Sequence, residues 1–218
     1  LSILAHELKA PLAAIDGYLR LIQQRVAGEE LASYDRMVDR SIIRLDGMKK
    51  LIYDLLDLTR IESGHKKRDI APVDLAEMAQ LSAETVAPAA AERYVTVALH
   101  VAASVPMTAD RGELEIILNN LLSNADRHTR DGVITIRLTR ADRRQVVSVM
   151  DTGEGMAPGM AESVLKMYVT SRGERWRHGY GLYICRQIIV SHGGDIWVES
   201  EKGRGTTVSF ALTEEGHD

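Results

Sequence analysis

The chain of 218 residues is poor in several features that mark particular classes of protein. Its single cysteine, Cys185, excludes an intrachain disulfide and suits a reducing compartment, so we expect a cytoplasmic protein or the cytoplasmic part of a membrane-anchored one. Aromatic residues make up only 5% and the net charge is −4, which favours neither base stacking nor attraction to nucleic acid. No apolar run approaches the roughly 20 residues that span a bilayer, and we expect no signal peptide.

The sequence does contain enough apolar residues for a sizeable core. Hydrophobic residues make up 45% and charged residues 27%, which is typical of a globular chain. The length allows one large domain or two small ones. Because Leu1 already lies inside a helical pattern without a cap, we expect a fragment of a longer protein, with any upstream sensor or membrane segment outside this chain.

The first stretch has the apolar spacing of a bundle helix that ends near Gly28. Steps of three and four residues alternate along Leu4, Leu8, Leu12, Ile15, Leu19, Ile22 and Val26. His6 lies two residues from Leu4 and Leu8, off this seam, where an exposed imidazole is a free nucleophile near neutral pH. Glu7 can accept from one ring nitrogen and leave the other to attack. The alternative is a surface histidine on an ordinary bundle helix.

A second amphipathic helix follows and ends around residues 63–64. Two long helices joined by a short loop predict an antiparallel hairpin. A lone hairpin leaves its apolar seam uncovered, so pairing of two copies into a symmetric four-helix bundle is expected. The basic run His65-Lys66-Lys67-Arg68 is interpreted as a linker with solvated charges. We therefore place one domain at residues 1–65 and a second at 66–218.

The second domain interleaves strands and helices, which predicts a two-layer α/β sandwich. Alternating apolar residues indicate strands. The expected strands are 69–73, 95–101, 105–108, 133–138, 146–150, 195–199 and 206–212. The expected helices run from Asp74 to about Arg93, from Asp110 onwards, and over 181–191, with Asp74 as an N-cap. The fold class is therefore α+β, with an N-terminal helical hairpin.

The helix that starts at Asp110 carries asparagines in its interior, where this residue type is unfavourable. Asn120 and Asn124 share one face, and asparagine is a poor helix former unless its amide has a task. Amide oxygens suit Mg²⁺ when nucleotide phosphates supply the negative charge. Arg127 and His128 follow one turn later, within reach of phosphate or ribose. The alternative is an exposed polar face.

Two glycine-containing motifs follow. Asp151-Thr152-Gly153-Glu154-Gly155 comes directly after a strand, where a carboxylate can accept from the exocyclic amine of adenine and reject guanine. Gly153 and Gly155 let the backbone pass close to a flat base. Gly179-Tyr180-Gly181-Leu182 precedes a helix whose free N–H groups can bind an anion. The weakest signal, Gly205-Thr206-Thr207, has an ordinary turn as its alternative.

The order of these motifs resembles the catalytic core of two-component sensor histidine kinases over nearly the whole chain. His6 to Leu12 resembles the phosphoacceptor box, Asn120 to Ala125 the asparagine box, and Asp151–Gly155 and Gly179–Leu182 the glycine boxes. The C-terminal part resembles the ATP-binding fold shared with gyrase and the MutL repair proteins. The resemblance implies ATP and Mg²⁺ as cofactors, a homodimer, and a response regulator as partner.

The resemblance also implies roles for single residues. His6 takes the γ-phosphoryl group of ATP and Glu7 is its acid/base neighbour. Asn124 holds Mg²⁺, Asn120 supports nucleotide binding, and Asp151 reads adenine. Gly179 and Gly181 shape the loop that covers the phosphates.

The chain departs from the family pattern in three places. Met167-Tyr168-Val169-Thr170-Ser171-Arg172 replaces a phenylalanine-rich box, and Arg177 and His178 stand where glycine and threonine are common. These two departures bear on nucleotide affinity and lid closure. Ala10 stands four residues after His6, where threonine or asparagine is common, which predicts weak phosphatase activity.

Three functions are compatible with the motifs. The preferred one is an ATP-dependent protein histidine kinase that phosphorylates His6 and passes the phosphoryl group to an aspartate of a response regulator. The second is a dimeric signalling scaffold with a degenerate nucleotide site, which the altered lid favours. The third is a conformational ATPase like the gyrase relatives, which leaves the hairpin with His6 unexplained.

Overall fold

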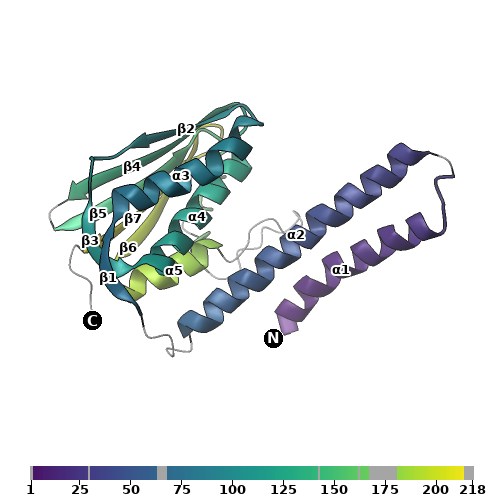
Figure 1. Ribbon diagram of the computed structural model, residues 1–218, viewed down its shortest axis with the longest axis horizontal. Helices are drawn as coiled ribbons and strands as arrows, with labels where there is room; N and C mark the ends of the chain where they lie inside the picture. Colours follow the sequence, from purple (N-terminus) through teal and green to yellow (C-terminus); the bar gives the residue numbers. More distant parts are fainter. Residues whose placement is uncertain are drawn as a thin grey trace. The chain divides into compact units, whose positions relative to one another are not determined.

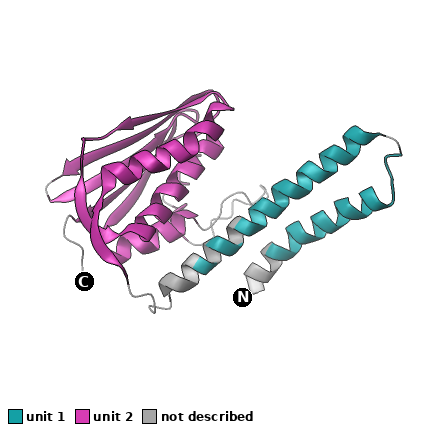
Figure 2. Cartoon of the chain, in the orientation of Figure 1, with its two compact units in different colours: residues 1–57 teal, residues 58–218 magenta. Residues whose placement is uncertain are grey.

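The computed structural model describes residues 2–28, 30–62, 68–141, 143–161, 163–166 and 181–213 (Figure 1). Side chains of residues 2–7 are not among the described parts of the first helix. The chain divides into two compact units, Leu1–Asp57 and Leu58–Asp218, which Figure 2 colours separately. We describe each unit by itself.

The first unit is a helical hairpin made of α1 (Ser2–Gln23) and the N-terminal part of α2 (Leu31–Glu62). Helix α1 ends ahead of the predicted Gly28, because Arg25 takes a left-handed backbone conformation with φ of 50°. Gly28 also has positive φ, and its carbonyl accepts from the Tyr34 hydroxyl at 3.0 Å, which fastens the turn. Across the hairpin the Arg44 guanidinium lies 5.9 Å from the centre of the Tyr18 ring.

Large apolar side chains on both helices of the hairpin are exposed in the single chain. Leu12 and Leu19 of α1 are 56% and 54% exposed, and Val38 and Ile42 of α2 are 43% and 51% exposed. Exposed apolar rows of this size mark surfaces that are covered by a partner.

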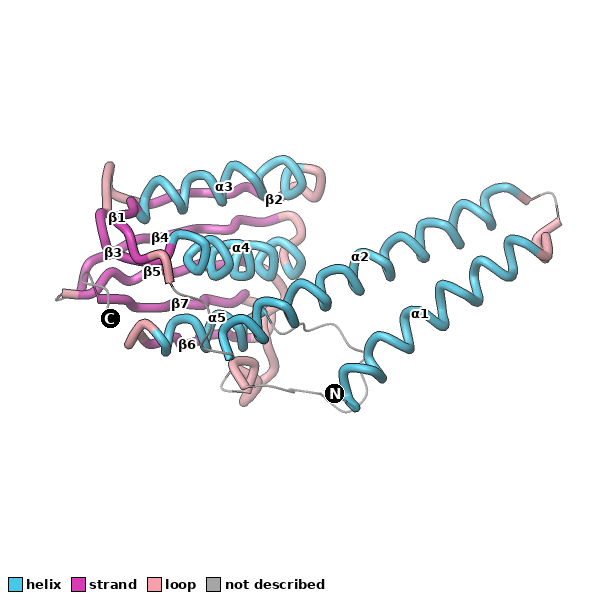
Figure 3. The backbone as a smooth tube through the Cα atoms, turned by 60° about the horizontal axis from the view of Figure 1, so that its bottom comes forward, coloured by secondary structure: helices cyan, strands magenta, loops and turns pink. Residues whose placement is uncertain are grey.

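The second unit is a mixed five-stranded sheet with helices on one face (Figures 1 and 3). The strand order is β2-β4-β5-β7-β6, in which β2 and β4 are parallel and the other neighbours are antiparallel. The strands are β2 (Val95–His100), β4 (Gly132–Ala141), β5 (Arg144–Asp151), β6 (Asp195–Glu201) and β7 (Gly205–Thr213). The helices are α3 (Leu75–Ala91), α4 (Arg111–His128) and α5 (Gly181–Ser191). The predicted two-layer α/β sandwich is confirmed.

A separate antiparallel pair, β1 (Ile70–Asp74) with β3 (Pro106–Asp110), leads directly into α3 and α4. Asp74 caps α3, as predicted, by accepting from the Ala76 N–H at 2.9 Å. Asp110 caps α4 in the same way, accepting from the Glu113 N–H at 3.1 Å. Both helices are therefore anchored at their first turn by the end of a strand.

The core lies between the helices and the sheet. Helix α4 lies between α3 and α5, and it packs on β4 and β5. The fully buried large residues on α4, β4, β5 and β7 include Leu114, Ile117, Leu118, Leu121, Leu122, Ile134, Ile136, Val147 and Phe210. Because α4 is fixed on this apolar side, the side chains on its remaining face have fixed positions.

The predicted solvated linker is wrong at Arg68. Residues 65–67 lie outside the described residues, but the Arg68 guanidinium forms an ion pair with Glu113 at 3.2 Å and donates to the Ser191 carbonyl at 3.2 Å. A guanidinium that pairs with a buried carboxylate exchanges part of its hydration for strong, charge-assisted hydrogen bonds.

None of the helices in the described ranges combines the length and apolar character that crossing a bilayer requires.

Candidate active site

Helix α4 presents three of the predicted polar residues in one row. Asn120, Asn124 and His128 are spaced by four residues, so they follow one face of the helix over a rise of about 12 Å. The first residue of α5 contacts the Asn120 end of this row. The turn after β5 contacts the His128 end. The row therefore connects the segments that carry the two glycine motifs.

Asn120 is packed against the start of α5. Its side chain is buried, and its amide nitrogen donates to the Ile116 carbonyl at 3.0 Å. A Cβ atom added at Gly181 would lie 2.6 Å from the Asn120 Oδ1, so a larger residue there would displace the Asn120 amide. The structure thus brings Asn120 and Gly181 together, whereas Leu182 is half-buried in the first turn of α5.

Asn124 is half-buried, and its amide forms no hydrogen bond within the described part of the chain. Among the described residues, no three His, Cys, Asp or Glu side chains converge as a metal-binding cluster. Mg²⁺ is commonly held by one or two protein oxygens together with the phosphates of a nucleotide. The free amide oxygen of Asn124 fits that arrangement. Arg127, in the last turn of α4, is exposed.

Asp151 ends strand β5 and pairs in the sheet with Thr206 of β7. Its Oδ1 atom accepts from the Gly153 N–H at 2.9 Å and from the Thr206 N–H at 3.3 Å. Its Oδ2 atom forms no hydrogen bond to any described residue, so this oxygen is available to a ligand. Burial raises the pKa of the Asp151 carboxyl, and the two amide donors lower it only in part.

Two glycines in the turn after β5 and one at the start of β7 allow three close backbone approaches. A Cβ atom at Gly153 would lie 2.1 Å from the His128 carbonyl oxygen, and one at Gly155 would lie 2.0 Å from that of Glu201. Gly155 also has a φ of 61°. Gly205, with a φ of 102°, faces the Asp151 carbonyl oxygen in the same way. No other residue type fits these positions, so the turn is held against both α4 and the β6–β7 hairpin.

His128 is fixed by a residue that the sequence motifs did not single out. Its Nδ1 atom lies 2.8 Å from Glu154 Oε1, and its carbonyl accepts from the Glu154 N–H at 3.3 Å. Glu154 is the fourth residue of the motif that starts at Asp151. Its position inside this motif was the only signal in the sequence that could have identified it.

Ser200 is a second residue that the sequence did not indicate. Its hydroxyl accepts from the Met156 N–H at 2.9 Å and lies 2.9 Å from both the Gly205 carbonyl oxygen and the Thr206 hydroxyl. A serine inside a strand carries no sequence signal of this kind. The weak signal at Thr206 is thereby placed in the network around Asp151.

The remaining predicted residues are not joined to this site by the described structure. Gly179 lies outside the described residues, as do the departures at residues 167–172 and at Arg177 and His178. His6 and Glu7 lie within α1, in the other unit, and their side chains are not described.

The fold and this arrangement define an ATP-binding domain. Residues 109–216 match the family of histidine kinase-, DNA gyrase B- and HSP90-like ATPases. Residues 1–64 match the His Kinase A phosphoacceptor domain. The chain therefore belongs to the two-component sensor histidine kinases and forms their catalytic core, as the resemblance predicted.

Individual relatives agree with this assignment. The alginate biosynthesis sensor protein KinB of Pseudomonas aeruginosa is 30% identical over 213 residues, which cover 95% of this chain and 35% of KinB. Full-length ShkA, solved with AMPPNP, has a TM-score of 0.70 and 27% identity over 99% of this chain and 46% of its own. ThkA, solved with the response regulator TrrA, has a TM-score of 0.77 and 21% identity over 98% of this chain and 60% of its own. The chain thus spans about a third of KinB's length.

Proposed function

We propose that the chain is an ATP-dependent protein histidine kinase that phosphorylates His6 and passes the phosphoryl group to an aspartate of a response regulator. The observation that carries this proposal is Asp151. Its second carboxylate oxygen has no hydrogen-bond partner among the described residues, at the end of the asparagine row on α4. An acceptor there suits the exocyclic amine of adenine.

The proposal assigns the rest of the nucleotide to the same face. Asn120 and Gly181 lie at the far end of the row, where the N-terminus of α5 presents backbone N–H groups suited to phosphate. Asn124 lies between the two ends and is the residue that would hold Mg²⁺. Arg127 and His128 follow on α4, within one turn of Asn124. Bound Mg²⁺ supplies charge neutralisation on the phosphates.

In the proposed reaction, the unprotonated ring nitrogen of His6 attacks the γ-phosphorus of ATP. A nitrogen–phosphorus bond forms, the bond from the γ-phosphorus to the bridging oxygen breaks, and ADP leaves. Glu7 accepts a hydrogen bond from the other ring nitrogen, which favours the nucleophilic tautomer, and takes the proton from that nitrogen as the nitrogen–phosphorus bond forms. Positioning and charge stabilisation account for most of the acceleration in phosphoryl transfer.

The proposal gives each domain its task. Residues 1–65 carry His6 and form the homodimer through the apolar seam, which the exposed Leu12 and Leu19 support. Residues 66–218 bind ATP. A response regulator docks on the phosphoacceptor domain, as a partner whose aspartate accepts the phosphoryl group. The ThkA relative, solved in complex with a response regulator, supports this partner class.

The test is incubation of the chain with γ-labelled ATP. We expect label that is lost in acid and stable in base, which is the behaviour of a phosphohistidine. His6→Gln should abolish the label and leave ATP affinity unchanged, because the substitution lies outside the nucleotide site. Label that persists in His6→Gln would refute the assignment of His6. ATP binding without label on the unmodified chain would favour the scaffold, and ATP hydrolysis without label would favour a conformational ATPase.

A further inference from the structure

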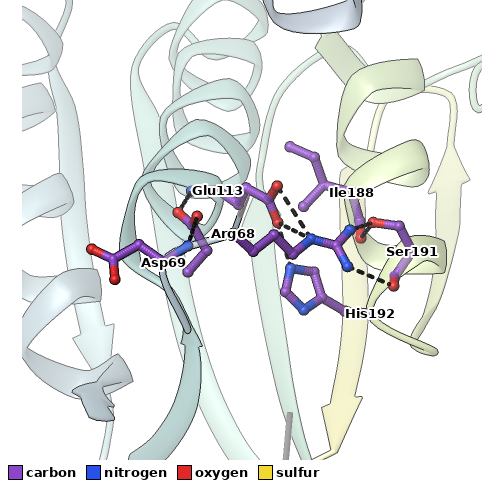
Figure 4. Close-up of polar contacts among 7 residues, drawn as sticks. Arg68, Asp69, Glu113, Ile188, Ser191 and His192 are labelled. Atoms are coloured by element: carbon purple, nitrogen blue, oxygen red, sulfur yellow. Dashed lines mark hydrogen bonds and ion pairs between the residues drawn. The ribbon is translucent and has the colours of Figure 1, made fainter. Parts of the chain in front are cut away.

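A buried polar cluster links the N-terminal end of α4 to the C-terminal end of α5, away from the proposed nucleotide site (Figure 4). We call it the clasp and define it by Arg68, Glu113, Ser191 and His192. Glu113 lies in the first turn of α4, and Ser191 and His192 lie at the end of α5. None of the proposed catalytic steps uses these side chains.

The centre of the clasp is a hydrogen bond between His192 and Glu113 that is shielded from water. His192 Nε2 lies 2.6 Å from Glu113 Oε2, and both side chains are less than 10% exposed. The Glu113 carboxylate has a lowered pKa in spite of its burial, because His192 and Arg68 stabilise its charge. Asp110 is the other charged group near Glu113, and it opposes this effect.

Arg68 bridges the two helices above this pair. Its guanidinium contacts the Glu113 carboxylate on α4, and on α5 it donates to both the carbonyl and the hydroxyl of Ser191. In Figure 4 the side chains of Arg68 and His192 approach Glu113 together. The clasp therefore ties α4 to α5 by two separate connections.

The contacts along α4 and α5 show that the helices run antiparallel with a single register. His192 meets Glu113 at one end, the Cys185 thiol lies 3.8 Å from the Ile117 carbonyl oxygen in the middle, and Gly181 meets Asn120 at the other end. The middle contact is between a thiol and a backbone oxygen, and the remaining side chains there are apolar. Apolar packing alone tolerates alternative arrangements better than a buried ion pair does.

We propose that Glu113, His192 and Arg68 are positioning residues for the nucleotide site. The clasp fixes the register in which α5 begins against Asn120, so that the N–H groups of α5 and the amides of α4 face the same phosphates. Its effect on the nucleotide reaches the site through the helices and needs no direct contact. The inference rests on the proposed function only in naming the nucleotide as ATP.

The test distinguishes an effect of the clasp on ATP binding from an effect on the stability of the fold. Glu113→Leu combined with His192→Leu removes both polar side chains and fills the space with apolar atoms, an exchange that is often neutral for stability. Arg68 keeps Ser191 as a partner and is partly exposed to water in this variant. We expect the full chain carrying both substitutions to remain folded by circular dichroism and to bind ATP at least tenfold more weakly in calorimetry.

Glu115→Leu is the matched control, because Glu115 lies two residues from Glu113 on α4 and its ion pair with Arg111 is exposed. It should leave ATP affinity within about twofold of the unmodified chain. A folded double-leucine variant with unchanged affinity would overturn the inference while leaving the proposed function intact. Failure of the unmodified chain to bind ATP would overturn the proposed function, and the inference with it.

Should the double-leucine variant not fold, Arg68→Leu gives the second test, because it removes the guanidinium that joins Glu113 to Ser191 and leaves the buried Glu113–His192 contact in place. Arg68 is partly exposed, so we expect this variant to fold. It should bind ATP at least threefold more weakly than the unmodified chain. A folded Arg68→Leu variant with unchanged ATP affinity would overturn the inference.

Discussion

At the scale of single residues, ionised Asp151 is unfavourable for folding but favourable for ligand binding. Burial raises the pKa of its carboxyl, so keeping it ionised costs folding free energy. Only one of its two oxygens is satisfied by backbone amides of the described chain. A ligand donor at the second oxygen recovers part of that cost. Functional groups commonly retain such a penalty.

Asp151→Asn should weaken ATP binding and stabilise the nucleotide-free chain. The asparagine can keep one oxygen toward the Gly153 and Thr206 amides, but it turns a donor toward the adenine amine. An unmatched buried polar contact costs about 1–3 kcal/mol, which is roughly a five- to hundred-fold loss of affinity. Calorimetry measures the affinities for ATP and for GTP. The ratio of the two affinities should be smaller in Asp151→Asn than in the unmodified chain. An unchanged ATP affinity would contradict the assignment.

The raised pKa of Asp151 also predicts a pH dependence. A carboxyl with a raised pKa favours the folded state below its unfolded value of about 3.9, and this contribution is lost as the pH rises through the folded pKa. The pH dependence of ATP affinity has the opposite sign to that of stability, because the adenine amine needs the ionised carboxylate as its acceptor. ATP affinity should therefore fall on acidification at a pH above the ordinary aspartate range. The pH dependence of ATP affinity should be measured for Asp151→Asn in parallel, and this variant should lack the fall. Any change that remains in the variant reports the titration of ATP itself.

Ala10 carries the prediction on phosphatase activity. It lies one turn after His6 on α1, and alanine offers no donor or acceptor to hold an attacking water. Autophosphorylation does not need that group, since its nucleophile is the imidazole. A purified phospho-regulator should lose its label slowly with the unmodified chain and faster with Ala10→Thr, at equal rates of autophosphorylation. Rapid loss with the unmodified chain would show that another residue does this task.

At the scale of secondary-structure elements, α4 organises the ATP-binding unit. Its apolar side is buried against the sheet, its first turn holds Glu113 of the clasp, and the face beside the apolar one carries the row from Asn120 to His128. A shift of α4 along its axis would move all of these groups at once. Its N-terminal anchor, Asp110, is therefore a sensitive position.

Asp110→Ala should destabilise the ATP-binding unit by about 1–3 kcal/mol. One carboxylate oxygen of Asp110 accepts from the Glu113 N–H and the other accepts from the Asp69 N–H, both at 3.1 Å, so the substitution leaves both amides without this acceptor. Chemical denaturation of the full chain measures the loss. Asp110→Asn, which keeps one acceptor oxygen, should lose less, and equal losses in the two variants would argue against the cap.

At the scale of the whole molecule, the two units differ in how completely a single chain covers its apolar surface. The sheet and its helices bury a continuous core, whereas the hairpin exposes large apolar side chains along α1 and α2. A second copy of the hairpin supplies matching apolar rows, because a symmetric bundle places identical surfaces against each other. The exposed seam is therefore consistent with a homodimer.

Replacing Leu19 and Ile22 by glutamate should give a monomer. Burying these charges in the bundle costs more than the seam contacts contribute, so the dimer is lost while the ATP-binding unit stays folded. Light scattering over a range of concentrations measures the mass. Ala13→Glu, an exposed position on the opposite side of α1, should leave the dimer intact. A monomeric mass for the unmodified chain would refute the prediction.

The sequence by itself determined the order of the elements, their type and most of their ends, because periodicity and caps are local properties. Asp74 and Asp110 could be identified as helix starts since a cap and its amide lie within three residues. The family could also be predicted, since the spacing of its motifs is a property of the chain. Arg68 was misjudged for the same reason, because a basic run beside a predicted helix end gives no sign of a distant carboxylate.

Only the tertiary structure decided which residues meet. It joined Glu154 to His128, Ser200 to Thr206 and His192 to Glu113, pairs separated by as many as 79 positions in the chain. It also decided that one oxygen of Asp151 is used by the fold, while the other meets no hydrogen-bond donor among the described residues. Such pairings depend on how α4 and α5 pack on the sheet. Packing is set by the sum of many apolar contacts, and no single local pattern records it.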